Sequence, residues 1–213
     1  LQAGTSGGVF QARFNPVANY WSGRLLRYQL SLASDGQTVT LSDTPTWEAA
    51  EVLTNRVSTS TGLNNRNVVI GSPRDKQGVN LPSPFKWTDL AQPFKDAFST
   101  TVDATGATVL DTALGQKRVD YLRGDRSNEI SDTNPTGLFR PHDYVLGDIV
   151  NSALVYVGKP KSLAEAGYSS FQSTNNSRPA TVYVNANDGM LHAFKEADGS
   201  ELFAYVPGFL GDK

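Results

Sequence analysis

The sequence predicts a mainly β protein with a helical insertion in its middle. Short apolar runs that alternate with polar residues occupy both ends of the chain, and this alternation is typical of half-buried strands. Glycine and proline separate these runs, and Asp-Gly pairs stand where tight turns are needed. Helix-type spacing is confined to the middle of the chain, so we expect a helical insertion on a β framework.

The start of the chain predicts a small antiparallel sheet. Residues 9–14 alternate roughly between apolar and polar side chains, and residues 26–32 alternate clearly. Asp35 and Gly36 then separate the second run from residues 38–41, a spacing typical of a hairpin. We therefore expect three short strands before the insertion begins.

The middle of the chain predicts two helices. Residues 44–53 offer Thr44 as a cap and Pro45 at the first helical position, followed by good helix formers. Residues 89–98 place Leu90, Phe94, Ala97 and Phe98 on one helical face.

Between these helices, residues 68–71 predict a short buried strand, because the run is apolar and ends at a glycine. Residues 55–67 and 76–84 are polar and rich in turn formers, so both segments predict loops.

The end of the chain predicts an antiparallel meander. Residues 153–157 form a strand, followed by a polar loop that ends at Pro179. Three further strands are expected at residues 180–184, 190–194 and 201–206. The turns between these three contain Asp188-Gly189 and Asp198-Gly199, because glycine supplies the positive φ that tight hairpins require.

Composition excludes several classes of protein. Lys and Arg number 19 against 21 for Asp and Glu, so the basic excess of a nucleic-acid binder is absent. The absence of cysteine excludes disulfides, thiolate zinc sites and cysteine nucleophiles. No apolar run approaches the ~18 residues of a membrane span. Because the chain opens at Leu1 without a secretion signal, we expect it to be an excerpt of a longer protein.

A family resemblance follows from several strings. Residues 182–194 resemble a blade of a quinoprotein-like β-propeller. Residues 118–126, 146–152 and 201–207 are similar to the PilC/PilY proteins of type IV pili. The resemblance implies a partial β-propeller of antiparallel meander blades, with residues 1–213 as the N-terminal portion of that domain. The insertion would span about 44–151, and the clear blade 180–207.

The same resemblance implies a non-catalytic function and a location. Family members are surface proteins at the pilus tip, exported through the periplasm and associated with the outer membrane. They support pilus assembly, control of retraction and adhesion. The partners implied are the remainder of the propeller or another chain, minor pilins, and a host or surface receptor. Neither nucleic acid nor a membrane span is expected.

No metal or other cofactor is expected in this segment. The pattern of a calcium loop requires oxygen ligands at alternate positions before its glycine. Ala186 and Phe194 occupy such positions before the two Asp-Gly turns, so both turns are interpreted as turns alone. The family's calcium loop would then lie beyond Lys213.

Two candidates for catalysis have little support in the pattern. Gly4–Gly8 fits the Gly-x-Ser-x-Gly pattern around Ser6, but a nucleophile elbow needs a strand before it and a helix after it. A flexible leader is the favoured interpretation. His142 and His192 could each act as a general base, yet neither has a recognisable serine, cysteine or metal partner. His192 is expected on a solvated strand position or in packing between blades.

The candidate binding site is the tripeptide Arg123-Gly124-Asp125, which integrin ligands use. The alternative is a structural charge cluster formed by Arg118, Asp120, Arg123, Asp125, Arg126 and Glu129.

Two rival functions stay open at this level. One is a quinoprotein-type dehydrogenase, in which the blades would position a cofactor. The other is a carbohydrate-binding propeller, for which Trp21, Trp47 and Trp87 could supply aromatic platforms.

Overall fold

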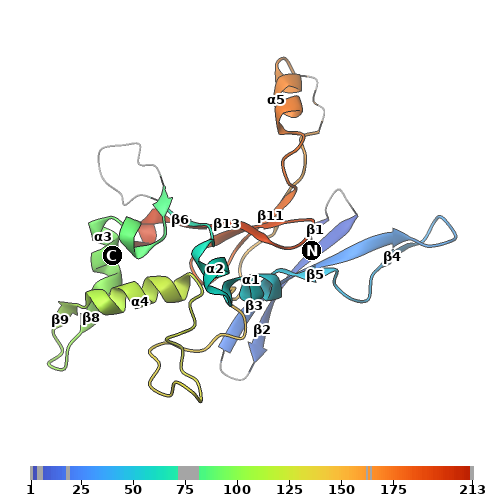
Figure 1. Cartoon of the computed structure of the whole chain (residues 1–213). Coiled ribbons are helices and arrows are strands. Elements are labelled where there is room, and N and C mark those ends of the chain that lie inside the picture. Colours follow the sequence, from blue (N-terminus) through green and yellow to red (C-terminus); the bar gives the residue numbers. More distant parts are fainter. Residues whose placement is uncertain are drawn as a thin grey trace.

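The computed structural model describes residues 2–3, 7–17, 20–71, 82–161, 163 and 165–211. It shows a β-rich body from which three narrow arms project (Figure 1). Two multi-stranded sheets make up the body, and a pair of packed helices lies at one end. The mainly β fold class is therefore confirmed.

The first sheet contains strands β1 (Gln2–Ala3), β2 (Gly8–Val17), β3 (Tyr20–Leu32) and β4 (Val39–Leu41), in that order. Strand β5 (Trp47–Glu48) also pairs with β3. All of these pairs are antiparallel, as the sequence predicted for this region. The turn between β3 and β4 is the expected one, since Gly36 has a φ of 66° and Asp35 accepts hydrogen bonds from two following backbone amides.

The second sheet has six strands in the order β10–β11–β12–β13–β6–β7. Strands β10 (Val155–Val157), β11 (Thr181–Asn185), β12 (Leu191–Lys195) and β13 (Glu201–Val206) form the predicted antiparallel meander, which we call the blade.

Both hairpin turns of the blade contain a glycine with positive φ, 84° at Gly189 and 70° at Gly199. Strand β6 (Val68–Ile70) pairs parallel with β13, and β7 (Ser83–Pro84) pairs antiparallel with β6. Both strands come from the expected insertion, so the insertion extends the blade's own sheet.

The first helix begins later than the sequence predicted. Helix α1 spans Ala49–Val57 with Glu48 at its N-cap, so Thr44 and Pro45 lie outside it. The reason is a tertiary contact: Trp47 is buried, and its indole Nε1 donates to the backbone oxygen of Glu196 at 2.9 Å. Pairing with β3 then holds this segment extended and delays the helix.

Other helices also depart from expectation. The loop predicted at 55–67 contains helix α2 (Ser60–Asn64), which Thr59 caps by accepting from Gly62 N. The helix predicted at 89–98 divides into a 3₁₀ turn η1 (Trp87–Asp89) and helix α3 (Gln92–Ser99). Residues 76–81 of the second expected loop lie outside the described residues.

Several further elements were not predicted. A small ribbon of β8 (Thr100–Val102) and β9 (Thr108–Leu110) leads to helix α4 (Thr112–Leu122), and Asp111 caps that helix by accepting from Leu114 N. Helix α5 (Tyr168–Asn175) lies within the loop expected before Pro179. A last 3₁₀ turn, η2, spans Gly208–Gly211.

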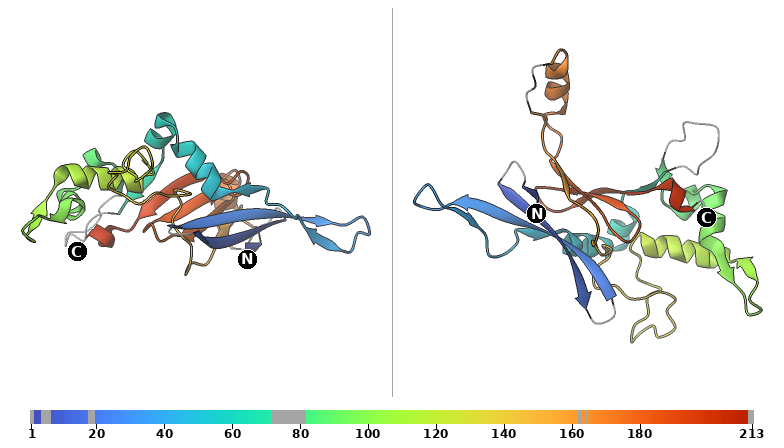
Figure 2. Two further views of the ribbon diagram at one scale, coloured as in Figure 1. Left: turned by 90° about the horizontal axis from the view of Figure 1, so that it is seen from below. Right: turned by 180° about the vertical axis from the view of Figure 1, so that it is seen from behind.

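Two apolar clusters pack on the blade, and Figure 2 shows the blade between the β2–β3 hairpin and the α3–α4 pair. The first cluster joins Val182, Val184 and Phe194 of the blade to the hairpin, α1 and residues 145–149. The second joins the blade and β6 to α3 and α4 through Met190, Ala204, Val206, Val68, Ile70, Phe94 and Val119. The blade therefore contributes buried side chains to both cores.

The three arms are the β3–β4 hairpin, the β8–β9 ribbon and the segment that carries α5 (Figure 1). Each exposes large apolar side chains, among them Leu32 at 64%, Val102 at 64% and Phe171 at 46% of their surface. Among the described helices, none has the length and apolar character needed to span a membrane.

Candidate functional site

Four charged side chains meet inside the blade, and we call them the buried ion cluster: Arg66, Asp188, His192 and Glu201. Arg66 Nε and Nη2 donate to the two carboxylate oxygens of Glu201 at 2.8 and 3.0 Å. His192 Nδ1 lies 2.8 Å from Glu201 Oε1, and His192 Nε2 lies 3.0 Å from Asp188 Oδ2. Arg66, His192 and Glu201 expose 1% or less of their side chains.

The topology explains why these residues meet. Asp188 lies in the β11–β12 turn, His192 on β12 and Glu201 at the start of β13, so the meander brings them together. Arg66 lies just before β6, and the parallel pairing of β6 with β13 carries it to Glu201. Each member therefore depends on strand pairing for its position.

The cluster fixes the protonation of His192. Carboxylates only accept hydrogen bonds, so a ring with a carboxylate at each nitrogen must donate from both and be an imidazolium. Burial alone would lower the pKa of His192, but the charge and hydrogen bond of Asp188, with the hydrogen bond of Glu201, raise it to about 9.

The carboxylates respond in the opposite direction. Burial opposes their ionisation, yet the charge of Arg66 outweighs it and holds the pKa of Glu201 far below its usual range. The charge of His192 likewise lowers the pKa of Asp188 against the effect of burial. Two positive and two negative groups thus compensate one another where water is excluded.

The cluster also ties the blade to the segment before it. Asp188 accepts from the backbone amide of Gly147 at 3.2 Å and from that of Met190 at 3.1 Å. A Cβ added at Gly147 would lie 2.5 Å from Asp188 N, and one added at Gly23 would lie 2.0 Å from Gly147 O. The β3 backbone, residues 146–148 and the β11–β12 turn therefore stack at contact distance.

The tripeptide Arg123-Gly124-Asp125 ends helix α4. The Arg123 guanidinium is turned inward and donates to the backbone oxygens of Phe85, Leu63 and Arg66, at 3.0, 3.2 and 3.1 Å. Gly124 is buried with a φ of 104°. Arg123 thus links the end of α4 to the backbone next to Arg66 of the buried ion cluster. These contacts favour the structural alternative for the tripeptide. Receptor binding through the tripeptide stays a prediction.

Asp125 is more accessible than Arg123. Its carboxylate accepts from Ser127 N at 2.8 Å and lines a pocket of about 190 Å³ with Asp120. Burial and the nearby charge of Asp125 raise the pKa of Asp120. Of the six residues in the predicted charge cluster, Arg126 and Glu129 form a direct ion pair at 3.0 Å, while Arg118 donates to the carbonyls of Phe98 and Thr100.

The other histidine holds an irregular loop to α4. His142 Nδ1 lies 2.8 Å from Glu129 Oε1, and its Nε2 lies 2.9 Å from the hydroxyl of Tyr121. The Tyr121 ring stacks on His142 and on Phe139, with centroid distances of 4.6 and 4.5 Å. Burial raises the pKa of Tyr121, so its phenol is not activated as a nucleophile.

For His192, the solvated alternative is wrong, because the side chain is fully buried. Neither histidine has a serine hydroxyl among its hydrogen-bond partners in the described part of the chain. Ser6 of the Gly-x-Ser-x-Gly match lies outside the described residues. Within those residues, no group of three or more His, Asp or Glu has an arrangement that could hold a metal ion.

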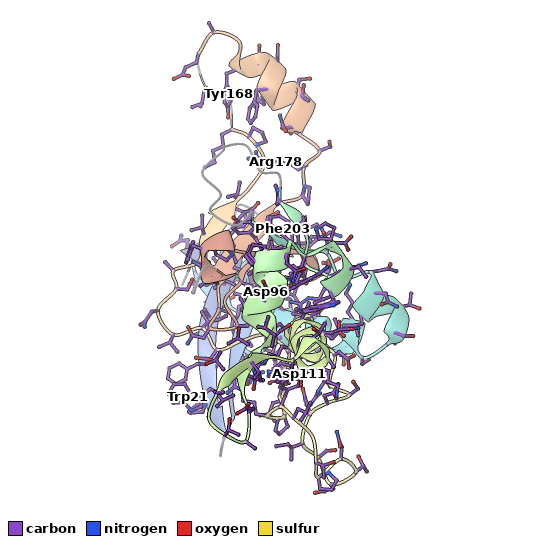
Figure 3. All side chains as sticks on the ribbon, turned by 90° about the vertical axis from the view of Figure 1, so that its left-hand side faces the viewer. Trp21, Asp96, Asp111, Tyr168, Arg178 and Phe203 are labelled. Atoms are coloured by element: carbon purple, nitrogen blue, oxygen red, sulfur yellow. The ribbon has the colours of Figure 1, made fainter. Side chains whose placement is uncertain are left out.

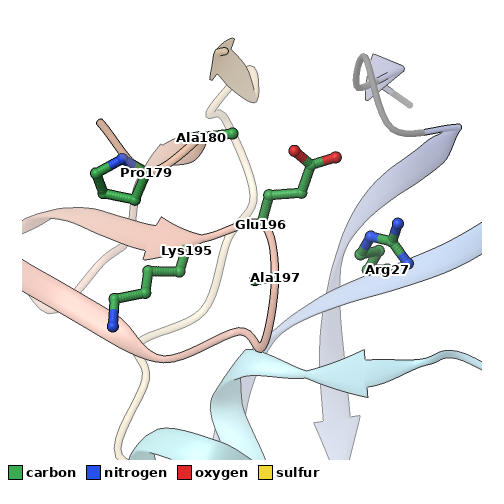
Figure 4. Close-up of a pocket in the computed structure, with 6 residues that line it drawn as sticks. All are labelled: Arg27, Pro179, Ala180, Lys195, Glu196 and Ala197. Carbon is green, nitrogen blue, oxygen red and sulfur yellow. The ribbon is translucent and has the colours of Figure 1, made fainter. Parts of the chain in front are cut away.

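A separate pocket of about 290 Å³ lies where the first sheet meets the blade (Figure 4). Its lining comes from Arg27 of β3, Pro179 and Ala180 just before β11, Lys195 at the end of β12, and Glu196 and Ala197 after it. It contains none of the sequence-predicted site residues. Glu196 there accepts from the Tyr156 hydroxyl at 2.8 Å, which joins two blade strands.

Sequence reasoning missed the buried ion cluster as a unit. The signal for His192 was its parity with Val184 and Phe194, which places it on the inward face of the blade. Asp188 and His192 are also four residues apart across a tight turn. Nothing local marked Arg66, because its partner Glu201 is distant in sequence.

Comparison with known proteins gives a consistent result. Residues 146–213 match the family described as the PilY1 beta-propeller domain, a range that includes the whole blade. The chain is 35% identical over 96% of its length to the type IV pilus biogenesis factor PilY1 of Pseudomonas aeruginosa strain PAK. A homolog of that factor from Xylella fastidiosa is 38% identical over 61% of the chain and 11% of its own length.

The chain spans about 16% of the length of the P. aeruginosa relatives. No solved structure matches it at a significant level. The predicted β-propeller class is confirmed by the family match.

Proposed function

Because the chain belongs to the PilY1 family of type IV pilus biogenesis factors, we propose that it is a non-catalytic scaffold within a β-propeller that supports pilus assembly. The observation that carries the proposal is the coincidence of the PilY1 propeller match with the blade, residues 146–213 against strands within 155–206. The relatives are named as biogenesis factors, which agrees with a role outside catalysis.

The face of the blade that points away from both cores has the side chains expected of a surface that packs on another sheet. Tyr183, Leu191, Phe203 and Tyr205 are partly exposed and belong to neither core cluster. Phe203, labelled in Figure 3, and Tyr183 form an edge-type aromatic pair with the centroids 6.3 Å apart. A sheet with one core-facing side and one half-exposed aromatic side suits stacking against a second sheet. The remainder of the propeller, or a partner chain, is the occupant we propose.

The finer parts of the function are proposals as well. We place the protein at the pilus tip on the cell surface, in contact with minor pilins, where it would assist adhesion to a host or surface receptor. The tripeptide is the weaker candidate for that receptor, because Arg123 would have to leave three backbone carbonyls to reach it. No cofactor is proposed for this segment, and a calcium site elsewhere in the parent stays compatible with it.

Carbohydrate binding has one observation in its favour. Trp21 is 51% exposed and packs beside Phe14, which is 44% exposed, with the centroids 5.6 Å apart. Trp47 is buried, and Trp87 packs against the second core cluster. Trp21 is thus the tryptophan that could offer its face to a sugar ring.

Complementation tests the scaffold proposal. In a strain lacking the gene, the full-length protein should restore surface pili, and so should the control Glu51→Gln, which changes an exposed residue of α1. Glu201→Gln, which breaks the buried ion cluster, should reduce surface pili in proportion to the loss of folded blade. Full piliation by a protein whose blade is shown to be unfolded would contradict the proposal.

The dehydrogenase alternative needs its own assay. The purified full-length protein is expected to show no quinone absorbance and no dye-linked alcohol oxidation. Turnover in that assay would replace the scaffold function with an enzymatic one.

A further inference from the structure

Helix α5 sits at the end of a finger that leaves the body of the protein between β10 and β11. Figure 1 shows the finger projecting beyond the sheets, and Figure 3 shows Tyr168 near its end and Arg178 at its stalk. None of the residues of α5 is buried. A helix of eight residues has little stability of its own in water. Ordering the finger therefore costs conformational entropy, and the finger adds no buried residue to either core.

Hydrogen bonds nevertheless hold the finger in a defined conformation. Arg178 Nε and Nη2 both donate to the backbone oxygen of Gly158, at 3.0 and 2.6 Å, and so close the stalk. Gln172 Nε2 reaches back to Pro160 O at 3.5 Å. Gly167, with a φ of 81°, turns the chain into the helix. These contacts present α5 in a defined direction.

The surface of the finger has an unusual composition. From Ala166 to Ser177 there is no charged residue, although charged residues make up 19% of the whole chain. Serine, threonine, asparagine and glutamine surround one aromatic pair, Tyr168 and Phe171, whose ring centroids are 5.4 Å apart. Aromatic anchors among adaptable, uncharged hydrogen-bonding groups are the composition of protein recognition surfaces.

We infer that the finger is a docking element whose Tyr168–Phe171 pair enters an uncharged apolar pocket on a protein subunit of the type IV pilus. This inference rests on the proposed function for the identity of the partner. The absence of charge from residues 166–177 selects the chemistry of the pocket, because this uncharged tip would leave a charged pocket desolvated and unpaired.

A second copy of the chain fits the finger less well. Eight helical residues extend only ~12 Å, which is a short contact for an interface that should bury about 1,200 Å² to be stable. The finger therefore suits insertion into a preformed pocket, where a short element can bury most of its surface.

The test uses the full-length protein and sheared, purified type IV pili as the probe. Phe171→Ser should weaken binding to the pili by about tenfold or more. The matched control is Leu32→Ser, which removes a comparably exposed apolar side chain from the β3–β4 arm and should bind as the wild type does. Both variants should keep the wild-type melting temperature, since neither side chain is buried.

Salt provides a second readout. Binding by the wild type should change by less than about twofold between about 50 and about 500 mM NaCl, because residues 166–177 offer no charge to pair with the pocket. Wild-type affinity in Phe171→Ser, or collapse of binding in high salt, would overturn the inference. Competition by a neutral polysaccharide such as dextran would overturn it too, by assigning the aromatic pair to sugar.

The two proposals fail in different ways. If surface pili depend on the protein but Phe171→Ser binds normally, the finger inference fails and the scaffold proposal survives. If the wild type neither binds pili nor is needed for them, both fail.

Discussion

Arg66, His192 and Glu201 carry full charges where the surrounding apolar side chains exclude water, and their partner Asp188 exposes 13% of its side chain. Removing such groups from water costs several kcal/mol each, and their mutual attraction offsets that cost only when every partner is in place. Asp188 and Glu201 each receive hydrogen bonds on both oxygens, and each has a cation in direct contact. At the scale of single residues, the blade is therefore sensitive to the loss of one charge.

The first prediction concerns pH. A histidine in an unfolded chain has a pKa near 6.5, and in the fold the pKa of His192 is raised to about 9, so between these values the folded state holds a proton that the unfolded state has lost. The stability that this proton contributes is fully present below about pH 6.5. It is lost as the pH rises through the folded value, by about 3 kcal/mol at most.

Urea unfolding at about pH 6 and about pH 9 measures this loss, and the nitrogen resonances of the imidazole identify its source. Both ring nitrogens of His192 should stay protonated at neutral pH. A neutral ring at pH 7 would contradict the prediction.

The second prediction concerns charge balance. Glu201→Gln keeps the shape of the side chain but leaves Arg66 without a counter-charge, which should cost about 3–5 kcal/mol in the free energy of unfolding. Arg66→Met together with Glu201→Gln should cost clearly less than the sum of the two single changes. Chemical denaturation of the four proteins measures both effects, with Glu51→Gln as the exposed control. Additive losses would mean that the pair is not coupled.

The third prediction concerns close backbone packing. Gly147→Ala places a methyl group 2.5 Å from Asp188 N, so the turn must move and the free energy of unfolding should fall by about 2 kcal/mol or more. Gly106→Ala is the matched control, since it also replaces a glycine but meets open space at a φ of 86° and should cost only about 1 kcal/mol. Equal losses in thermal melting would show that the contact at Gly147 is not tight.

At the scale of elements, local pattern predicted the blade well and the insertion poorly. Residues 180–184, 190–194 and 201–206 are short β-type runs joined by Asp-Gly turns, so local information determines them. Trp47 shows the opposite case. The residues around it favour a helix, but a contact with Glu196, far along the chain, holds it in a strand.

Helix α4 was missed for a related reason. It contains Gly115, a weak helix former, and its second half is polar except for Val119, Tyr121 and Leu122. Gly115 is there because a Cβ would lie 2.5 Å from Ser99 Oγ and 2.9 Å from the Trp87 ring. The glycine therefore allows α4 to pack closely against the end of α3, at the expense of helix propensity. A local sequence pattern does not reveal such a contact between two helices.

The fourth prediction concerns the finger as an element. Replacing residues 161–177 with a short Gly-Ser turn should change the free energy of unfolding by no more than about 1 kcal/mol, because α5 buries no residue. Circular dichroism and urea unfolding of the shortened protein measure this. Loss of the blade's strand signal would show that the finger is needed to form the β10–β11 pair.

At the scale of the whole molecule, the blade holds two cores together. Val182, Val184 and Phe194 belong to one core, while Met190, Ala204 and Val206 belong to the other. The buried ion cluster lies between them, through His192 and Glu201. Sequence reasoning could place each strand of the blade but not this arrangement, since Arg66 reaches Glu201 only through a parallel pairing that no local signal encodes.

The fifth prediction is cooperative unfolding. Trp47 belongs to the first core and Trp87 packs on the second, so each can report on one core when the other two tryptophans are replaced by phenylalanine. Because both cores share the blade, the fluorescence melt of each variant should coincide within about 2 °C with the circular-dichroism melt of that same variant. Separate transitions would show that the cores are independent units.

The parallel pairing of β6 with β13 also means that β6 is synthesised long before its partner strand. Val68 pairs with Ala204, more than 130 residues later. At synthesis rates of about 5–20 residues per second, β6 waits roughly 7 to 30 s for the strand that completes it. Throughout that interval Val68, Ile70 and Arg66 lack the strand with which they pair and the carboxylate of Glu201, so the order of emergence decides when the molecule is most open to misassembly. The last residues of β13 end that exposure for both cores at once.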